Sequence, residues 1–118
     1  MIMMEKLIEE VTQLVEAEYG RAGARYGLTH HSDHEAYGVL LEEFQEAEEE
    51  VRLCGSALEL LWKKIKRDSN DEQKMESLSL IQTKALLGAC ELIQVAAMAK
   101  KSAITICDRR AVDEFKGE

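Results

Sequence analysis

The feature that most constrains this chain is a stripe of apolar residues that recurs at spacings of three and four. Its members are Ala36, Leu40, Phe44, Ala47, Val51 and Cys54. A helix of about 3.6 residues per turn places residues at this spacing on one side, whereas a strand does not. Ser32 and Glu35 form a capping-box pattern, which predicts where this helix begins. The stripe therefore predicts a long helix with one side against a core.

The composition of the whole chain also favours helices. The 118 residues include no proline, 5% are aromatic and 32% are charged, which suits long helices and poorly suits a sheet. We therefore expect one all-α domain over residues 1–118, folded as a four- to five-helix bundle. Residues 21–29 are expected to connect two helices. The predicted helices cover about 2–19, 32–53, 56–66 and 70–106.

The carboxylates of the striped helix fall into two groups. Glu42 and Glu49 lie opposite the apolar stripe, where they face water. Glu43, Glu46 and Glu50 instead lie along one flank of the stripe, at the edge of the surface that packs. Like charges at a packed edge repel one another unless a cation sits among them. An ordinary acidic surface remains the alternative interpretation of this group.

A second segment, residues 85–99, is apolar nearly all round, as expected of a helix inside a bundle. Only Glu91 and Gln94 interrupt it. A buried carboxylate must be paired, metal-bound or protonated, because burying it alone is very costly. Two pairs of residues thus offer oxygen atoms at the same i, i+3 spacing, namely Glu43 with Glu46 and Glu91 with Gln94. Such oxygens suit Mg²⁺ or Mn²⁺ and poorly suit zinc.

These residues carry a resemblance to a known family. The pentapeptide at residues 42–46, Glu-Glu-Phe-Gln-Glu, resembles the E-E-x-x-E signature of the all-α nucleoside triphosphate pyrophosphohydrolases, the MazG-like superfamily, in which a later helix supplies E-x-x-D. Residues 31–43 and 91–99 also resemble segments of the phage-type, single-domain members. The resemblance covers roughly a quarter of the chain. It implies a MazG-like helical bundle.

The resemblance also implies a reaction and a ligand set. In the family, carboxylates hold Mg²⁺, and a water attacks the triphosphate to release pyrophosphate and a nucleoside monophosphate. Carried over position by position, Glu43, Glu46 and Glu91 are the catalytic residues and metal ligands. Gln94, the fourth metal ligand, stands where the family pattern has Asp, so it keeps an oxygen and loses a negative charge. Mn²⁺ is the alternative metal.

Three further residues are predicted to bind the substrate. Lys84 lies on the same side of its helix as Glu91, two turns earlier, and Lys101 lies beyond it. Both lysines are expected to contact phosphate. His34 lies in the first turn of the striped helix, where backbone N–H groups favour anions, so a contact to phosphate or base is expected there. Helix capping is the alternative role for this histidine.

Charge and length limit the partners. The net charge of −8 argues against binding to a nucleic-acid polymer, which requires clustered Lys and Arg, but it does not exclude a single nucleotide. An elongated helical chain of 118 residues buries more surface by pairing with a copy of itself. We therefore expect a homodimer or homotetramer.

The cysteines and the N-terminal region indicate a cytoplasmic protein. The chain has three cysteines and no C-x-x-C spacing, which is typical of a reducing compartment. Charge follows too soon after the first residues for a signal peptide, and no apolar run is expected to reach the ~20 residues of a membrane span.

Two functional hypotheses follow. The first is Mg²⁺-dependent hydrolysis of ribo- or deoxynucleoside triphosphates to monophosphate and pyrophosphate, as in the housecleaning of nucleotide pools. The second is a non-catalytic interaction protein that keeps the helical bundle with a degenerate metal site. A di-iron bundle is disfavoured because it requires Glu-x-x-His pairs, and Gln94 stands where His is needed.

Overall fold

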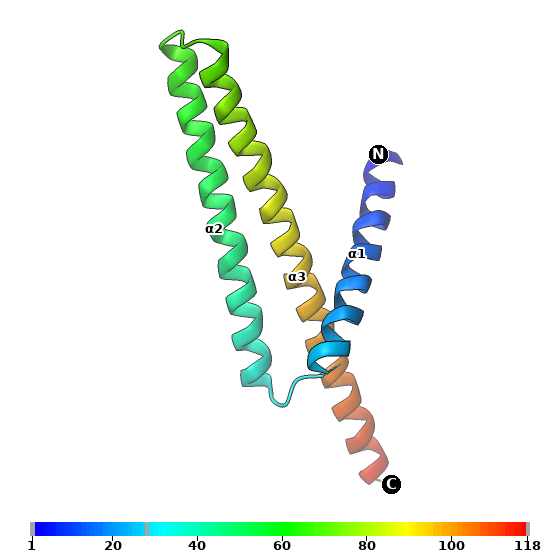
Figure 1. Ribbon diagram of the computed structural model, residues 1–118. Coiled ribbons are helices and arrows are strands. Elements are labelled where there is room, and N and C mark those ends of the chain that lie inside the picture. Colours follow the sequence, from blue (N-terminus) through cyan, green and yellow to red (C-terminus); the bar gives the residue numbers. More distant parts are fainter. Residues whose placement is uncertain (1, 28, 118) are drawn as a thin grey trace. The chain divides into compact units, whose positions relative to one another are not determined.

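The computed structural model describes residues 2–27 and 29–117 (Figure 1). This part of the chain contains helices and no strands, so the expected all-α class is confirmed. The helices are α1 (Ile2–Tyr26), α2 (Asp33–Lys66) and α3 (Asp71–Gly117).

The number of helices differs from the expected four to five, because the described residues form three. α1 continues past the predicted end at residue 19, α2 runs unbroken through Cys54 and Gly55, and α3 extends beyond residue 106. A single glycine inside a helix costs only about 1 kcal/mol. At Gly20 and Gly55 that cost is too small to end a helix whose hydrogen-bonded pattern continues on both sides.

α1 ends instead at Tyr26, and Gly27 follows it directly. This glycine has a φ of +91°, a left-handed conformation that L side chains rarely adopt, and its N–H donates to the carbonyl of Gly23 at 2.9 Å. α2 begins with the predicted capping box: the Glu35 N–H donates to Ser32 Oγ at 3.1 Å, and Glu35 Oε2 accepts from the His31 N–H at 3.3 Å. The helix ends thus follow local capping chemistry.

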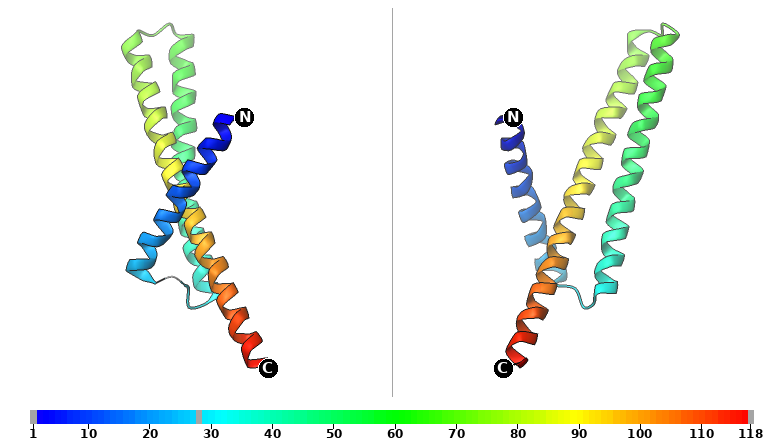
Figure 2. Two further views of the ribbon diagram at one scale, coloured as in Figure 1. Left: turned by 90° about the vertical axis from the view of Figure 1, so that its right-hand side faces the viewer. Right: turned by 180° about the vertical axis from the view of Figure 1, so that it is seen from behind.

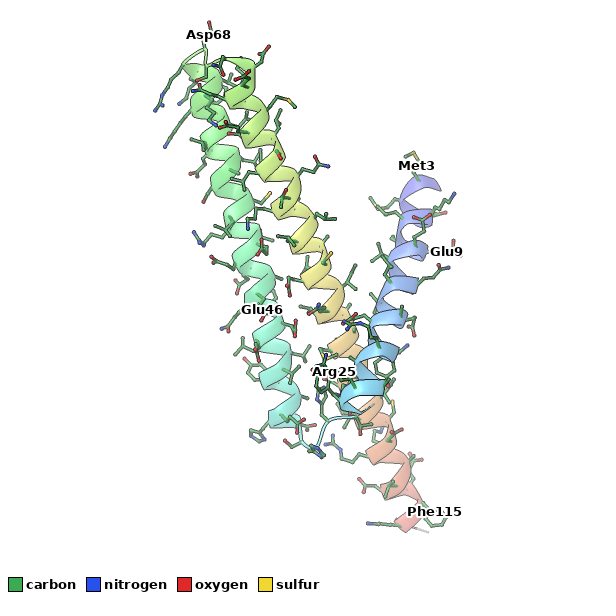
Figure 3. All side chains as sticks on the ribbon, in the orientation of Figure 1. Met3, Glu9, Arg25, Glu46, Asp68 and Phe115 are labelled. Atoms are coloured by element: carbon green, nitrogen blue, oxygen red, sulfur yellow. The ribbon has the colours of Figure 1, made fainter. Side chains whose placement is uncertain are left out.

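The chain divides into two compact units. The second unit, residues 44–92, is a helical hairpin in which the two long helices lie antiparallel and side by side (Figures 1 and 2). Asp68, at the tip of the hairpin in Figure 3, has a φ of +53°. Asn70 caps α3 through its side-chain oxygen, which accepts from the Gln73 N–H at 2.9 Å.

Small residues form the buried seam of the hairpin. Ala47, Ala57, Ser77 and Gly88 are buried, which lets the two helices approach closely. The large apolar residues of this unit are mostly exposed instead. They are Phe44, Val51, Leu58, Leu60, Trp62, Ile65, Met75, Leu78, Leu80, Leu86, Leu87 and Leu92. The hairpin therefore leaves much apolar surface uncovered.

The first unit comprises residues 1–43 and 93–118 and packs α1 against the nearer parts of α2 and α3. Ala36 and Ala97 form its buried apolar contacts. Lys100 pairs with Glu16 of α1 and lies over the ring of Tyr19, with its Nζ 5.0 Å from the ring centroid. These contacts attach α1 to α3.

α3 is the one helix in the described chain that is long and apolar enough to cross a membrane, by length and composition alone. This result differs from the expectation that no such run exists. Only 11% of the apolar stretch is buried. Length and composition alone do not distinguish a membrane span from other apolar helices, so the cytoplasmic location stays a prediction.

Gly88→Ala should stabilise the protein by about 0.5–1 kcal/mol, since alanine loses less backbone entropy than glycine in a helix interior. A Cβ at this position would lie 3.6 Å from Glu50 Cβ and 3.8 Å from a Val51 methyl, which is ordinary van der Waals contact. Urea unfolding at fixed protein concentration measures the change. Gly88→Leu is the contrasting variant, because its larger side chain must displace α2 and destabilise the hairpin. Destabilisation by alanine would contradict the described seam.

Candidate functional site

Glu46 of α2, labelled in Figure 3, and Glu91 of α3 lie close together within the hairpin. Each places a carboxylate oxygen within 4.8 Å of the other. Burial raises the pKa of Glu91, and the hydrogen bond with Glu46 and the negative charges of Glu46 and Glu50 raise it further. Glu91 Oε2 is buried and has no hydrogen-bond partner among the described residues. The pair therefore has room for a proton or a cation.

Among the described residues, Lys84 forms an ion pair with only one carboxylate of the hairpin. Its Nζ lies 3.3 Å from Glu50 Oε2, and both side chains are largely buried. Within the part of the chain that the structure describes, no lysine, arginine or histidine lies within 4 Å of the carboxylates of Glu46 or Glu91. The predicted phosphate contact of Lys84 thus competes with its ion pair to Glu50.

The donor set of the hairpin fits a hard divalent cation. Two carboxylates on facing helices supply oxygen atoms, the ligands that Mg²⁺ and Mn²⁺ prefer, and no histidine or cysteine accompanies them to favour zinc. A cation between them would also remove the repulsion that raises the pKa of Glu91. The hairpin thus contributes two of the four predicted metal ligands.

The other two predicted ligands belong to the first unit. Glu43 lies one helical turn before Glu46 on α2, and Gln94 lies one turn after Glu91 on α3. Both line a pocket of about 580 Å³ in the first unit. The hairpin therefore contains Glu46 and Glu91, and the pocket of the first unit is lined by Glu43 and Gln94. A single site that contains all four residues stays a prediction.

All three helices and the segment before α2 line the pocket of the first unit. Lys101, a predicted substrate contact, is buried in it with 7% exposure. His34 is exposed and does not line it. The lining residues are Glu18, Arg21, Ala22, Arg25, Tyr26, His30, Glu35, Val39, Glu43, Gln94, Met98 and Lys101.

His30 is the most unusual residue of the pocket. It is 6% exposed, and neither ring nitrogen has a hydrogen-bond partner among the described residues. Its backbone N–H donates to Thr105 Oγ1 at 2.9 Å, which fixes the position of the residue. Glu35 Oε1 is 3.9 Å from Nδ1, too far for a hydrogen bond. Burial lowers the pKa of His30 and the charge of Lys101 lowers it further, so the ring is neutral at pH 7.

The two arginines of the pocket are already engaged. Arg21 donates to both carboxylate oxygens of Glu18, at 2.6 and 2.8 Å from Nη2. Arg25 lies over the ring of Tyr26, with 5.2 Å between its Cζ and the ring centroid. The pocket is therefore lined by paired charges and apolar surface and is not a simple cationic cleft.

Sequence reasoning missed part of this pocket. Arg21, Arg25 and Tyr26 lie in the last turns of α1, in the segment that was expected to be a connector. His30 lies between helices, where no periodic pattern marks a buried position. The adjacent capping box at Ser32 could have drawn attention to it, because a capped helix start fixes the residues just before it.

We compared the chain with protein-family models, with curated proteins and with solved structures, and none matched. The hairpin contributes paired carboxylates, and the first unit contributes a pocket with a buried histidine and a buried lysine.

Glu91→Gln should stabilise the metal-free protein at pH 7. Because the folded state raises the pKa of Glu91, ionising this carboxyl costs stability as the pH rises above about 4.5, and the neutral amide avoids that cost. Thermal unfolding in chelator, at pH 7 and at pH 4, measures the difference, which should vanish at the lower pH. Glu48→Gln, an exposed position on α2, is the matched control. Equal melting temperatures of Glu91→Gln and wild type at pH 7 would show that ionising Glu91 costs the folded protein no stability.

His30 should make stability decrease in mild acid. Its pKa is lowered in the folded state, so the unfolded chain binds the proton more tightly, and stability present above about pH 6.5 is lost as the pH falls towards the folded-state pKa. Urea unfolding of wild type and His30→Gln at pH 7.5 and 5.5 measures this loss. The variant should lose less stability than wild type over this range, whereas the exposed His34→Gln should behave like wild type. Identical losses in all three proteins would refute the assignment.

Proposed function

We propose that the protein hydrolyses ribo- or deoxynucleoside triphosphates to nucleoside monophosphate and pyrophosphate with Mg²⁺, or Mn²⁺, as cofactor. The observation that carries the proposal is the carboxylate pair of Glu46 and Glu91, which has a buried unpartnered oxygen and no neighbouring cation among the described residues. The resemblance of the acidic helix to the MazG-like enzymes supports the same reaction.

In this proposal Glu46 and Glu91 hold the cation from opposite helices of the hairpin. Glu43 and Gln94 remain predicted ligands through the resemblance to the family. When bound, the metal neutralises charge on the phosphate oxygens and lowers the pKa of a bound water. Lys84 keeps Glu50 neutralised and so limits the negative charge beside the ligands. Lys101 remains a predicted substrate contact because it is buried in the pocket of the first unit.

Self-association forms part of the proposal. The hairpin exposes large apolar residues along its length, including Trp62 at 57% exposure, while its seam buries mainly small ones. A second copy of the chain would cover such a surface, as in helical bundles built from paired hairpins. We therefore propose a homodimer or homotetramer.

The same exposed surface favours a second candidate, a non-catalytic interaction protein. In that case the apolar face of the hairpin would bind another protein, and Gln94 in place of the family Asp would mark a weakened metal site. This candidate predicts neither turnover nor stabilisation by Mg²⁺. The pyrophosphohydrolase predicts both, and saturation at 100 times the dissociation constant should add about 2.7 kcal/mol of stability.

Pyrophosphate release from a panel of ribo- and deoxynucleoside triphosphates tests the enzyme directly. Release should require Mg²⁺ or Mn²⁺ and stop in chelator. Glu46→Gln should lower turnover at least about 100-fold, since even outer-shell partners of a metal are worth 10- to 100-fold. Circular dichroism should show unchanged helix content in this variant.

Glu48→Gln is the matched control for this experiment, because it removes one exposed charge from the same helix two residues away. It should keep wild-type turnover. Unaltered, metal-dependent release from Glu46→Gln would refute the assigned site, and silence of folded wild type across the whole panel would favour the interaction protein.

A further inference from the structure

The pocket of the first unit has two chemically different ends. Glu43 and Gln94 lie at one end, and Glu35, His30 and Lys101 lie at the other. Glu43 and Glu35 are eight residues apart on α2, which corresponds to about 12 Å at ~1.5 Å of rise per residue. This length is comparable to that of an extended nucleotide.

The pocket contains a side chain, His30, whose hydrogen-bonding atoms have no partner among the described residues. His30 is buried with both ring nitrogens unpartnered among the described residues, and its backbone is fixed by Thr105. A neutral imidazole offers one N–H donor and one acceptor nitrogen. Buried polar groups are normally hydrogen-bonded, and leaving one unpaired costs stability. A ligand with both a donor and an acceptor on one edge would satisfy this ring.

The middle of the pocket is apolar. Val39 lies between Glu35 and Glu43 on α2, Met98 lies between Gln94 and Lys101 on α3, and Ala22 and Tyr26 of α1 also line the pocket. The volume of about 580 Å³ falls within the range of small-molecule sites. A flat heterocycle has apolar faces and a hydrogen-bonding edge, so it matches both the apolar middle and the imidazole end. An isolated phosphate has no apolar face for this lining, and a neutral imidazole offers it only one N–H donor.

We propose that this pocket receives the nucleoside part of the substrate, with the His30 ring hydrogen-bonded to the edge of the base. The inference deepens the proposed function, on which it rests for placing the phosphates at the Glu43 and Gln94 end. A site that reads a base through hydrogen bonds rejects bases with the wrong edge, because the buried ring is then left unpaired. His30 is thus the residue that determines which base the protein accepts.

Binding without metal tests the inference separately from catalysis. The histidine ring signals of the full chain are followed by NMR in chelator during titration with the nucleoside 5′-monophosphates of each base. The preferred base should shift the ring signals of His30 but not those of His34. Ribose 5-phosphate, which has the sugar and phosphate without a base, should leave His30 unmoved. An equal shift with ribose 5-phosphate would mean that the pocket takes phosphate, and would overturn the inference.

A pair of variants sharpens the test. His30→Phe keeps a ring of similar shape and removes both nitrogens, so it should weaken binding of the preferred monophosphate about 10-fold, the worth of one net hydrogen bond. The matched control His34→Phe changes an exposed histidine outside the pocket and should bind like wild type. If His30→Phe does not fold, the NMR titration of wild type still tests whether the pocket binds a base.

The two proposals can fail independently. Metal-dependent pyrophosphate release with no base-dependent shift at His30, and unchanged base preference in His30→Phe, would overturn the pocket and leave the enzyme. Base-dependent shifts at His30 without turnover of any triphosphate would support the pocket as a nucleotide-binding site and remove the catalytic assignment.

Discussion

Electrostatic crowding in the seam of the hairpin is the constraint on which the rest of the structure depends. Small residues such as Ala57 and Ser77 bring α2 and α3 close together, so the acidic side chains beside that seam cannot all withdraw into water. Lys84 neutralises Glu50, which leaves Glu46 and Glu91 to share one negative environment. The packing that forms the hairpin therefore also brings the two carboxylates together, and the proposed cation site follows from that packing.

Periodicity predicted the helix α2, but only part of the face that it buries. Ala36 and Ala47 of the apolar stripe are buried, whereas Phe44 and Val51 are exposed, because small residues form the seam between the helices. The limits of the helices were less predictable. Gly55 carries the usual sign of a helix break, but its small cost is outweighed by the helical hydrogen bonds on both sides. The burial of His30 was not predicted, because this residue lies in a connection, where burial depends on tertiary packing that leaves no periodic trace.

Both proposed sites contain a buried polar side chain with at least one atom that has no hydrogen-bond partner among the described residues. Glu91 has a raised pKa and an unpartnered oxygen, and His30 has a lowered pKa and two unpartnered nitrogens. Such groups reduce stability, and proteins retain them mainly where a ligand supplies the missing partner. The shifts have opposite signs because burial disfavours the charged form of each group, anionic in one residue and cationic in the other. One physical effect thus accounts for both pKa shifts, that of Glu91 in the hairpin and that of His30 in the first unit.

The hairpin distributes its side chains in an unusual way, with small residues inside and large apolar residues outside. Unfolding an isolated protomer would therefore expose little additional hydrocarbon, and the accompanying change in heat capacity would be small for a chain of 118 residues. Most of the hydrophobic free energy would instead be released when another surface covers Trp62 and its neighbours. Folding and assembly would then be linked, so that the concentration of the chain, as well as its sequence, determines how stable it is.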